Sequence, residues 1–322
     1  MAELVDAHDS KSCGATHGSS ILPPGTMKKF ICIVGPTASG KSDLAVEIAR
    51  KIGGEVVSAD SRQVYKSLNI GSGKITKKEM CGIPHYLLDV ASPKRVFTVS
   101  DYQKKTEAVL NKIWKKDKIP ILVGGTGQYI EAIVDGLVFP EVPPNKELRK
   151  KLDKASLSDL QKKLKKLDPR RYEEIDIYNP VRLIRAIEIA THLGKVPKLK
   201  KQKRDFKTLI IGIKTDTDEL REKVHTRLIK RMRQGMLAEV KNLHKKEGVS
   251  WKRLESLGLE YRYLAYYLQN KMSRSEMLEK LETEIGRYAK RQKTWFKRDK
   301  RIKWFSLKER GRIYDTTKNF LR

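Results

Sequence analysis

A glycine-rich loop that directly follows an apolar run constrains the fold of this chain more than any other feature. Residues 30–34 read Phe-Ile-Cys-Ile-Val, a short apolar run typical of a buried parallel strand. The next residues match the pattern G-x-x-x-x-G-K-[ST] in full: Gly35, Pro36, Thr37, Ala38, Ser39, Gly40, Lys41 and Ser42. A helix is expected from Lys41 to Lys51, because Gly53-Gly54 then interrupts the apolar periodicity. A strand, this loop and a helix in this order predict a phosphate-binding P-loop.

The residues of this loop suit the binding of phosphate. Glycines let the backbone N–H groups turn toward phosphate oxygens, and the start of a helix adds its positive dipole. Lys41 can bring a positive charge to the terminal phosphates, and the hydroxyl of Ser42 can be a ligand of Mg²⁺. We therefore expect a phosphate site that uses Mg²⁺ as its cofactor.

Further short apolar runs predict the fold class. Residues 55–58, 119–123 and 208–213 each read as a buried strand, and residues 99–116 read as a helix. Strands that alternate with helices predict an α/β fold, here a P-loop NTPase-like parallel sheet flanked by helices. Helical patterns at 220–244, 251–269 and 275–297 follow the last of these strands.

One segment differs from this pattern and predicts an inserted helical domain. Residues 145–204 contain 19 Lys and Arg against 8 Asp and Glu, with leucines near helical spacing. The predicted organisation is a disordered tail at 1–26, the first part of the core at 27–144, a basic helical insertion at 145–204, and the completion of the core with C-terminal helices at 205–322. The insertion either binds a polyanion or is an ordinary amphipathic pair whose charges face water.

The charge of the chain points toward an anionic partner. Lys and Arg number 69 against 39 Asp and Glu, a formal net charge of +30. This excess favours a polyanion such as nucleic acid, although a generally lysine-rich surface is the alternative. No apolar run approaches the roughly 20 residues that span a bilayer, and residues 1–26 lack the pattern of a secretory signal. We expect a cytoplasmic protein with no membrane partner.

The P-loop alone does not identify the reaction. A kinase or NTPase normally has an acidic residue after an apolar strand, whereas residues 121–123 are followed by Gly124-Gly125-Thr126. Asp89 is a weaker candidate for that acid. Asp60 follows the strand at 55–58 and should lie near the phosphates, because neighbouring parallel strands end at one crevice. Asp60 could hold Mg²⁺ through water, accept a proton, or simply cap the next turn.

Seven blocks of sequence, in order, resemble the tRNA dimethylallyltransferase family. Beyond the P-loop at 35–42 they are Ser58-Ala59-Asp60-Ser61-Arg62-Gln63-Val64-Tyr65, Asn69-Ile70-Gly71-Ser72-Gly73-Lys74, Pro84-His85-Tyr86-Leu87-Leu88-Asp89, Leu122-Val123-Gly124-Gly125-Thr126-Gly127-Gln128-Tyr129, residues 179–188 (Asn-Pro-Val-Arg-Leu-Ile-Arg-Ala-Ile-Glu) and residues 289–296 (Ala-Lys-Arg-Gln-Lys-Thr-Trp-Phe). The resemblance spans residues 27–304. The two-Cys, two-His zinc finger of eukaryotic relatives is missing, so the sequence resembles the bacterial type.

The resemblance implies a reaction and its partners. The dimethylallyl group of dimethylallyl diphosphate would pass to N6 of the adenine at tRNA position 37, 3′ of the anticodon, in tRNAs that read codons beginning with U. In such a family the P-loop holds the diphosphate of the prenyl donor, although nucleotide binding is not excluded by a phosphate cradle. No sequence feature demands more than a monomer.

The same resemblance implies roles for individual residues. Asp60 would take a proton from the adenine amine, Thr126 would hydrogen-bond near that amine, and Lys41 would neutralise the departing diphosphate together with an arginine. The segment from Arg227 to Gly235 is shorter than the family pattern, so both Arg227 and Arg231 are candidates for that arginine, and we prefer Arg227. The residues implied to contact tRNA are Asp60, Ser61, Arg62, Gln63, Thr126, Arg149, Val181, Arg182, Leu183, Ile184 and Arg185.

Two basic regions have structural alternatives. Arg182 and Arg185 lie three apart on one predicted helix and share a face, where pairing with Glu188 would replace a role in RNA binding. At the C-terminus, lysines and arginines surround Trp295 and Trp304. We interpret both tryptophans as core anchors and the surrounding charges as phosphate contacts.

Three other functions remain open from the residues alone. An adenylate (cytokinin-type) isopentenyltransferase would share the P-loop but has no use for a basic insertion. A P-loop kinase for a small molecule would turn over ATP without a prenyl donor. A non-enzymatic RNA-binding protein would not need Asp60 beside an intact phosphate loop.

Overall fold

The computed structural model describes residues 27–322, so the predicted disordered tail at 1–26 lies outside the described residues. The chain forms two compact units, which are described separately. Among the described residues, the first contains those from Met27 to Val134 and from Arg204 to Arg322, and the second runs from Asp135 to Lys203.

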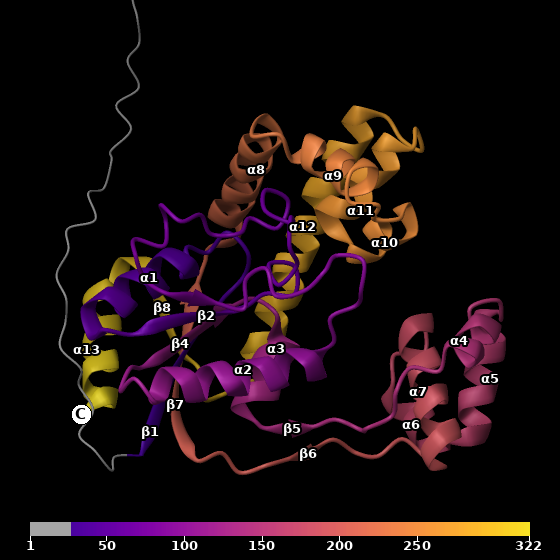
Figure 1. The fold of residues 1–322 in the computed structure, drawn as a ribbon, viewed down its shortest axis with the longest axis horizontal. Helices are drawn as coiled ribbons and strands as arrows, with labels where there is room; N and C mark the ends of the chain where they lie inside the picture. The colour runs from indigo at the N-terminus through magenta and orange to yellow at the C-terminus, as the bar shows by residue number, and fades with distance from the viewer. Residues whose placement is uncertain (1–26) are drawn as a thin grey trace, which may run out of the picture. The chain divides into compact units, whose positions relative to one another are not determined.

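The first unit is built on a parallel sheet of six strands in the order β3-β2-β4-β1-β7-β8 (Figure 1). The strands are β1 (Lys28–Val34), β2 (Glu55–Ala59), β3 (His85–Tyr86), β4 (Pro120–Gly124), β7 (Phe206–Lys214) and β8 (Lys303–Ser306). In β1, Ile31 pairs with Ile121 of β4 on one side and with Leu209 of β7 on the other. The α/β fold class predicted from the apolar runs is confirmed.

Helices cover both faces of this sheet, which explains why its central strands are apolar throughout. Ile31 and Ile33 face α1 (Lys41–Ile52) and α13 (Arg310–Leu321), while Phe30 and Cys32 face the opposite layer. That layer includes α2 (Val99–Trp114), α3 (Gly127–Val134), α8 (Thr217–Arg233) and α12 (Arg274–Lys297). The P-loop lies between β1 and α1, at the carboxyl edge of the sheet.

The C-terminal helices are shorter than predicted. The helix expected at 220–244 is broken at Gly235, whose φ of +95° favours glycine, into α8 and α9 (Met236–Lys245). The stretch at 251–269 is broken at Gly258, with φ of +76°, into α10 (Trp251–Leu257) and α11 (Leu259–Leu268). Both predictions of a continuous helix were wrong, because each predicted helix is interrupted by a glycine with a positive φ.

The two tryptophans near the C-terminus have different environments. Trp304 is partly buried and packs against the core, as predicted. Trp295 is 38% exposed, so the prediction that it is a core anchor was wrong. A Cβ atom on Gly127 would lie 2.3 Å from its ring, so Trp295 covers the start of α3.

The second unit is a small helical domain with its own core. Its helices are α4 (Lys146–Leu152), α5 (Leu157–Leu167), α6 (Pro169–Glu174) and α7 (Pro180–Leu193), and a ribbon pairs β5 (Leu137–Val138) with β6 (Lys200–Lys201). Leu160, Leu164, Leu183 and Ile187 are buried together. Within residues 27–322, no helix combines the length and the apolar character needed to cross a bilayer.

Candidate active site

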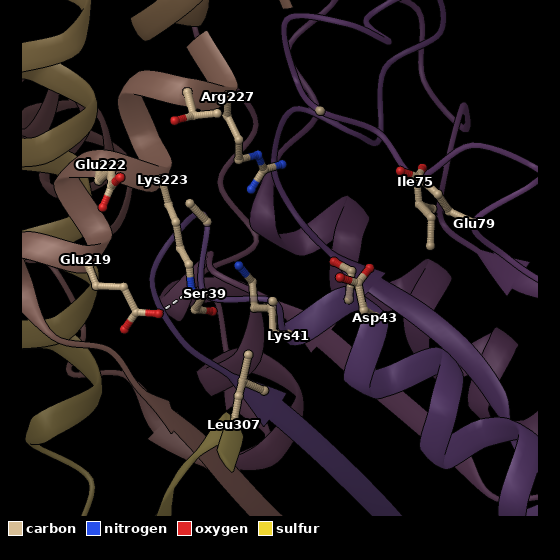
Figure 2. A pocket seen from close by; sticks show the side chains of 15 residues that line it. Ser39, Lys41, Asp43, Ile75, Glu79, Glu219, Glu222, Lys223, Arg227 and Leu307 are labelled. Atoms are coloured by element: carbon tan, nitrogen blue, oxygen red, sulfur yellow. Dashed lines mark hydrogen bonds and ion pairs between the residues drawn. The ribbon is translucent and has the colours of Figure 1, made fainter. Parts of the chain in front are cut away.

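Two cavities at the P-loop share Lys41, Ser42 and Arg227 in their walls. The larger, of about 670 Å³, lies between the P-loop and α8, where Lys41 and Arg227 extend into the same space (Figure 2). The smaller, of about 70 Å³, continues under the ends of β2 and β4 and is lined by Thr37, Asp60 and Gln63 among others. The predicted phosphate loop and Asp60 therefore meet in one region.

The P-loop is held by a glutamine from α12. The side chain of Gln292 accepts a hydrogen bond from the backbone N–H of Thr37 at 2.8 Å and donates to the carbonyl of Gly125 at 2.9 Å. Gln292 is buried, so it ties the P-loop to the segment after β4. No sequence pattern predicts this contact, because 255 residues separate its two partners.

Lys41 is a buried cation at the bottom of the loop. Its ammonium donates a hydrogen bond to the carbonyl of Pro36 at 3.0 Å. Burial lowers the pKa of Lys41 from its usual value to about 8, an effect that Asp60 opposes and Arg227 reinforces. An anionic ligand would reverse this shift, because it stabilises the charged ammonium.

Arg227 and Arg231 lie four residues apart on α8, and they differ in their partners. Arg231 donates to the carbonyl of Gly71 and to Glu260, each at 3.4 Å. Arg227 has no hydrogen-bond or ion-pair partner among residues 27–322, although it lines both cavities. Burial, together with the nearby charge of Arg231, lowers the pKa of Arg227 to about 10. A desolvated guanidinium without a partner is a site for an anion.

Asp60 has one occupied and one open carboxylate oxygen. Its Oδ1 accepts the backbone N–H groups of Arg62 at 2.7 Å and Gln63 at 3.2 Å, which is the capping contact expected of an Asp in a turn. Its Oδ2 has no such partner in the described part of the chain. Of the three roles that the sequence left open, the structure shows capping by one oxygen, and the second oxygen is available to the cavity.

Thr126 stands beside this turn. Its Oγ1 accepts the backbone N–H of Ser61 at 3.0 Å, and its own N–H donates to the carbonyl of Ala59 at 3.2 Å. Arg62 donates to the carbonyl of Ser61. These contacts bring Asp60, Ser61, Arg62, Gln63 and Thr126 to adjacent strand ends, although Thr126 does not line either cavity.

No acid occupies the position where a P-loop NTPase has one. A Cβ atom on Gly124 would lie 2.1 Å from the carbonyl oxygen of Ala59, so β2 and β4 approach too closely there for any side chain. Asp89, the weaker candidate, forms a 2.6 Å ion pair with Lys74, is half exposed and lines neither cavity. The end of β4 therefore carries no acid of the kind that positions Mg²⁺ and water for nucleotide hydrolysis, while the acids that line the larger cavity, Asp43, Glu79, Glu219 and Glu222, come from other segments.

The smaller cavity has an apolar side that sequence reasoning missed. Val56, Ile75, Leu88 and Val123 line it, together with His85. Burial lowers the pKa of His85, and its Nδ1 lies 2.8 Å from the carbonyl of Ile83. A small space lined by apolar residues as well as by the cations Lys41 and Arg227 suits a short hydrocarbon attached to a diphosphate.

The residues of the second unit that were predicted to contact tRNA differ in how accessible their side chains are. Arg149 and Arg185 both bind the buried carboxylate of Glu188, at 2.7 and 2.5 Å. Leu183 is fully buried, so its side chain belongs to the core of the unit rather than to its surface, and Ile184 packs against that core. Val181 is 75% exposed and the side chain of Arg182 is 60% exposed, so these two are accessible to a partner.

Comparison with known proteins gives the family. Residues 63–299 match the sequence model of the family described as IPP transferase. The chain belongs to the IPP transferase family. Among relatives of this IPP transferase, the tRNA dimethylallyltransferase 1 of Syntrophus aciditrophicus is 43% identical over 279 residues, covering 85% of this chain and 91% of that protein. The tRNA dimethylallyltransferase of Halothermothrix orenii is 38% identical and covers 95% and 96%.

Solved structures agree with the assignment to the IPP transferases. The full-length tRNA isopentenylpyrophosphate transferase from Bacillus halodurans is 30% identical with a TM-score of 0.70, over 92% of this chain and 97% of that one. A eukaryotic dimethylallyltransferase described as acting on tRNA is 25% identical with a TM-score of 0.66, over 83% and 69%. The IPP transferase fold therefore extends over most of the chain.

Proposed function

We propose that this IPP transferase moves the dimethylallyl group of dimethylallyl diphosphate to N6 of the adenine at tRNA position 37, 3′ of the anticodon, in tRNAs that read codons beginning with U. Buried Lys41 and Arg227, which has no ion-pair partner among residues 27–322, converge on the larger cavity, and this pair of cations carries the proposal. The relatives named tRNA dimethylallyltransferase support tRNA as the acceptor. The apolar side of the smaller cavity supports a short prenyl group as the donor's hydrocarbon.

The proposed reaction exchanges one bond for another. N6 of the adenine attacks C1 of the dimethylallyl group, and the bond between C1 and the diphosphate oxygen breaks with its electron pair. Lys41 and Arg227 stabilise the negative charge that develops on the leaving diphosphate. Oδ2 of Asp60 accepts the proton that N6 loses, and Thr126 orients the amine. The products are prenylated tRNA and diphosphate.

Mg²⁺ fits the residues present at the P-loop. The hydroxyl of Ser42 lines both cavities, and oxygen is the ligand that Mg²⁺ prefers. Within residues 27–322 no group of three acidic, His or Cys side chains could hold a metal, so the remaining ligands would be diphosphate oxygens and water. When bound there, Mg²⁺ supplies charge neutralisation to the diphosphate.

Recognition of tRNA is proposed to use residues of both units. The loop from Asp60 to Gln63, with Thr126, would contact the adenine, which must leave its stack to reach the donor. In the second unit, Arg182 and Val181 would contact the RNA directly. Arg149 and Arg185 would instead hold α7 in place through their ion pairs with Glu188. We expect a monomeric enzyme acting in the cytoplasm.

One assay separates this function from its alternatives. The protein is incubated with Mg²⁺, dimethylallyl diphosphate and either tRNA or AMP, and mass spectrometry measures the gain of one prenyl unit. Prenylated tRNA is expected. Label on AMP alone would indicate a cytokinin-type enzyme, and ATP turnover without prenyl transfer would indicate a kinase.

A further inference from the structure

The carboxylate of Glu239, on α9, is surrounded by four hydrogen-bond donors. It accepts the consecutive backbone N–H groups of Asn69, Ile70 and Gly71 at 2.9, 2.6 and 3.0 Å. The hydroxyl of Tyr261, on α11, donates to the same carboxylate at 3.0 Å. Consecutive N–H groups that converge on one point form an anion-binding concavity, and here a carboxylate of the protein fills it.

The loop that Glu239 holds is part of the cavity wall. Ser72 and Gly73 line the smaller cavity, and the carbonyl of Gly73 accepts a hydrogen bond from Gln63 at 3.2 Å. Gln63 is next to the turn that Asp60 caps. One end of the loop therefore touches Glu239 and the other touches the cavity and the turn of Asp60.

The same loop packs against both arginines of α8. Gly73 has φ of +59°, and a Cβ atom there would lie 1.7 Å from Nη2 of Arg231 and 3.2 Å from Nη2 of Arg227. The carbonyl of Gly71 accepts a hydrogen bond from Arg231 at 3.4 Å. A shift of the loop would therefore move Arg231, which is bonded to its backbone, and would change the space beside Arg227.

We infer that Glu239 is a positioning residue for the transfer reaction, because it fixes the loop of residues 69–73, which lies against Arg231 and against Arg227, the arginine proposed to face the leaving diphosphate. The inference rests on the proposed function for the identity of the anion. Glu239 touches no substrate; its effect passes through Gly71 and Gly73 to Arg231 and Arg227. Tyr261 supports the same carboxylate and is buried, so the arrangement is rigid.

Glu239→Gln tests this role, because an amide keeps the shape but loses the charge and turns an N–H group toward backbone donors. The dissociation constant of inorganic diphosphate, measured by calorimetry with Mg²⁺, should rise about tenfold or more, since small displacements of positioned charges cost up to about 10²-fold. The KM for dimethylallyl diphosphate should rise in parallel, while the KM for tRNA stays unchanged.

Glu276→Gln is the matched control. Glu276 also accepts a backbone N–H, that of Ser273 at 2.8 Å, but it caps α12 and lines neither cavity. Glu276→Gln should leave diphosphate binding unchanged. An equal loss in Glu276→Gln, or diphosphate affinity within twofold of wild type in Glu239→Gln, would overturn the inference.

Tyr261→Phe keeps the inference testable if Glu239→Gln does not fold. It removes one donor and keeps the carboxylate, so diphosphate binding should weaken in the same direction by a smaller factor; unchanged binding would count against the inference. Diphosphate binding is measured without any transfer. Wild-type protein that binds diphosphate but prenylates no tRNA would therefore refute the proposed function and leave the role of Glu239 intact.

Discussion

The buried charged residues of the P-loop cavity and those of the helical unit differ in how many hydrogen-bond and ion-pair partners they have. In the cavity, Arg227 is desolvated and has no hydrogen-bond or ion-pair partner in the described part of the chain, where Asp60 also keeps one oxygen open. In the helical unit, Glu188 is buried and accepts from Arg149, Arg185 and the backbone of Asn145. Burial alone would raise the pKa of Glu188, but these hydrogen bonds hold it below its usual range. Buried charges that lack partners indicate a ligand, whereas saturated ones indicate structure.

The most severe test of this contrast is Asp60→Asn. The amide can still accept the turn N–H groups through one oxygen, but it cannot take a proton. We expect kcat to fall by about 10² to 10⁴, the range typical of a lost general base, with tRNA affinity retained. Single-turnover rates and filter binding of tRNA measure the two quantities. Lost affinity with an unchanged rate per bound complex would make Asp60 a docking residue.

Glu188→Gln tests the structural side of the contrast. It removes the charge that two arginines share, so the free energy of unfolding should fall by about 3 kcal/mol, the low end for breaking a buried ion pair because both arginines are partly exposed. Urea denaturation followed by circular dichroism provides the measurement. Unchanged stability together with weakened tRNA binding would show that Arg149 and Arg185 serve the RNA instead.

Arg227→Gln should behave in the opposite way. Removal of a desolvated charge without a partner should leave stability equal or higher, while kcat/KM for the prenyl donor falls about 100-fold, as for a lost charge stabiliser in a transition state. Arg231→Gln is the comparison variant, since its guanidinium already binds Glu260 and Gly71. A larger loss of donor binding in Arg231→Gln would reverse the assignment of the two arginines.

The low pKa of Lys41 predicts a pH dependence that the helical unit should not share. Lys41 titrates at about 8 in the free protein, so it is charged below that pH and neutral above it. Donor affinity should therefore be constant below pH 8 and fall by up to about tenfold per pH unit above it. Lys41→Arg, which stays charged, should flatten the profile. A flat profile in the wild type would contradict a role for this ammonium in donor binding.

The smallest effect is expected for Arg182→Ala. The side chain of Arg182 is exposed, and its ion pair with Asp176 is long, at 3.8 Å, so its loss should leave folding intact. Removal of one phosphate contact should weaken tRNA binding a few-fold and reduce the slope of log affinity against log salt by about one. A stability loss comparable with that of Glu188→Gln would place Arg182 among the structural arginines.

The fold was predictable where local chemistry dictates structure. The apolar runs of β1, β4 and β7 and the P-loop motif predict a parallel sheet with a phosphate site at its edge. Strand β8 was missed because Lys303–Ser306 is short and polar at its ends, and it forms only by pairing with β7. The breaks at Gly235 and Gly258 were missed because apolar periodicity continues through both glycines.

The candidate site was predictable only in part, for a related reason. Lys41, Asp60 and Arg227 were selected by motif and resemblance, and the structure brings them to shared cavity walls. Gln292 and Glu239 were missed because each acts on backbone groups about 170 to 255 residues away. Such contacts depend on tertiary packing, and no regular spacing of residues along the sequence predicts them.

Gly124 has a consequence for how this enzyme can evolve. A glycine codon is one nucleotide from an aspartate codon, so random mutation repeatedly offers an acid at the position where hydrolytic relatives of the P-loop fold carry one. In each such mutant the Cβ atom of residue 124 would lie 2.1 Å from the carbonyl oxygen of Ala59, so the new side chain would clash with β2. Strands β2 and β4 would have to separate before an acid could be accommodated at residue 124, so the contact between these two strands excludes an acid from the end of β4.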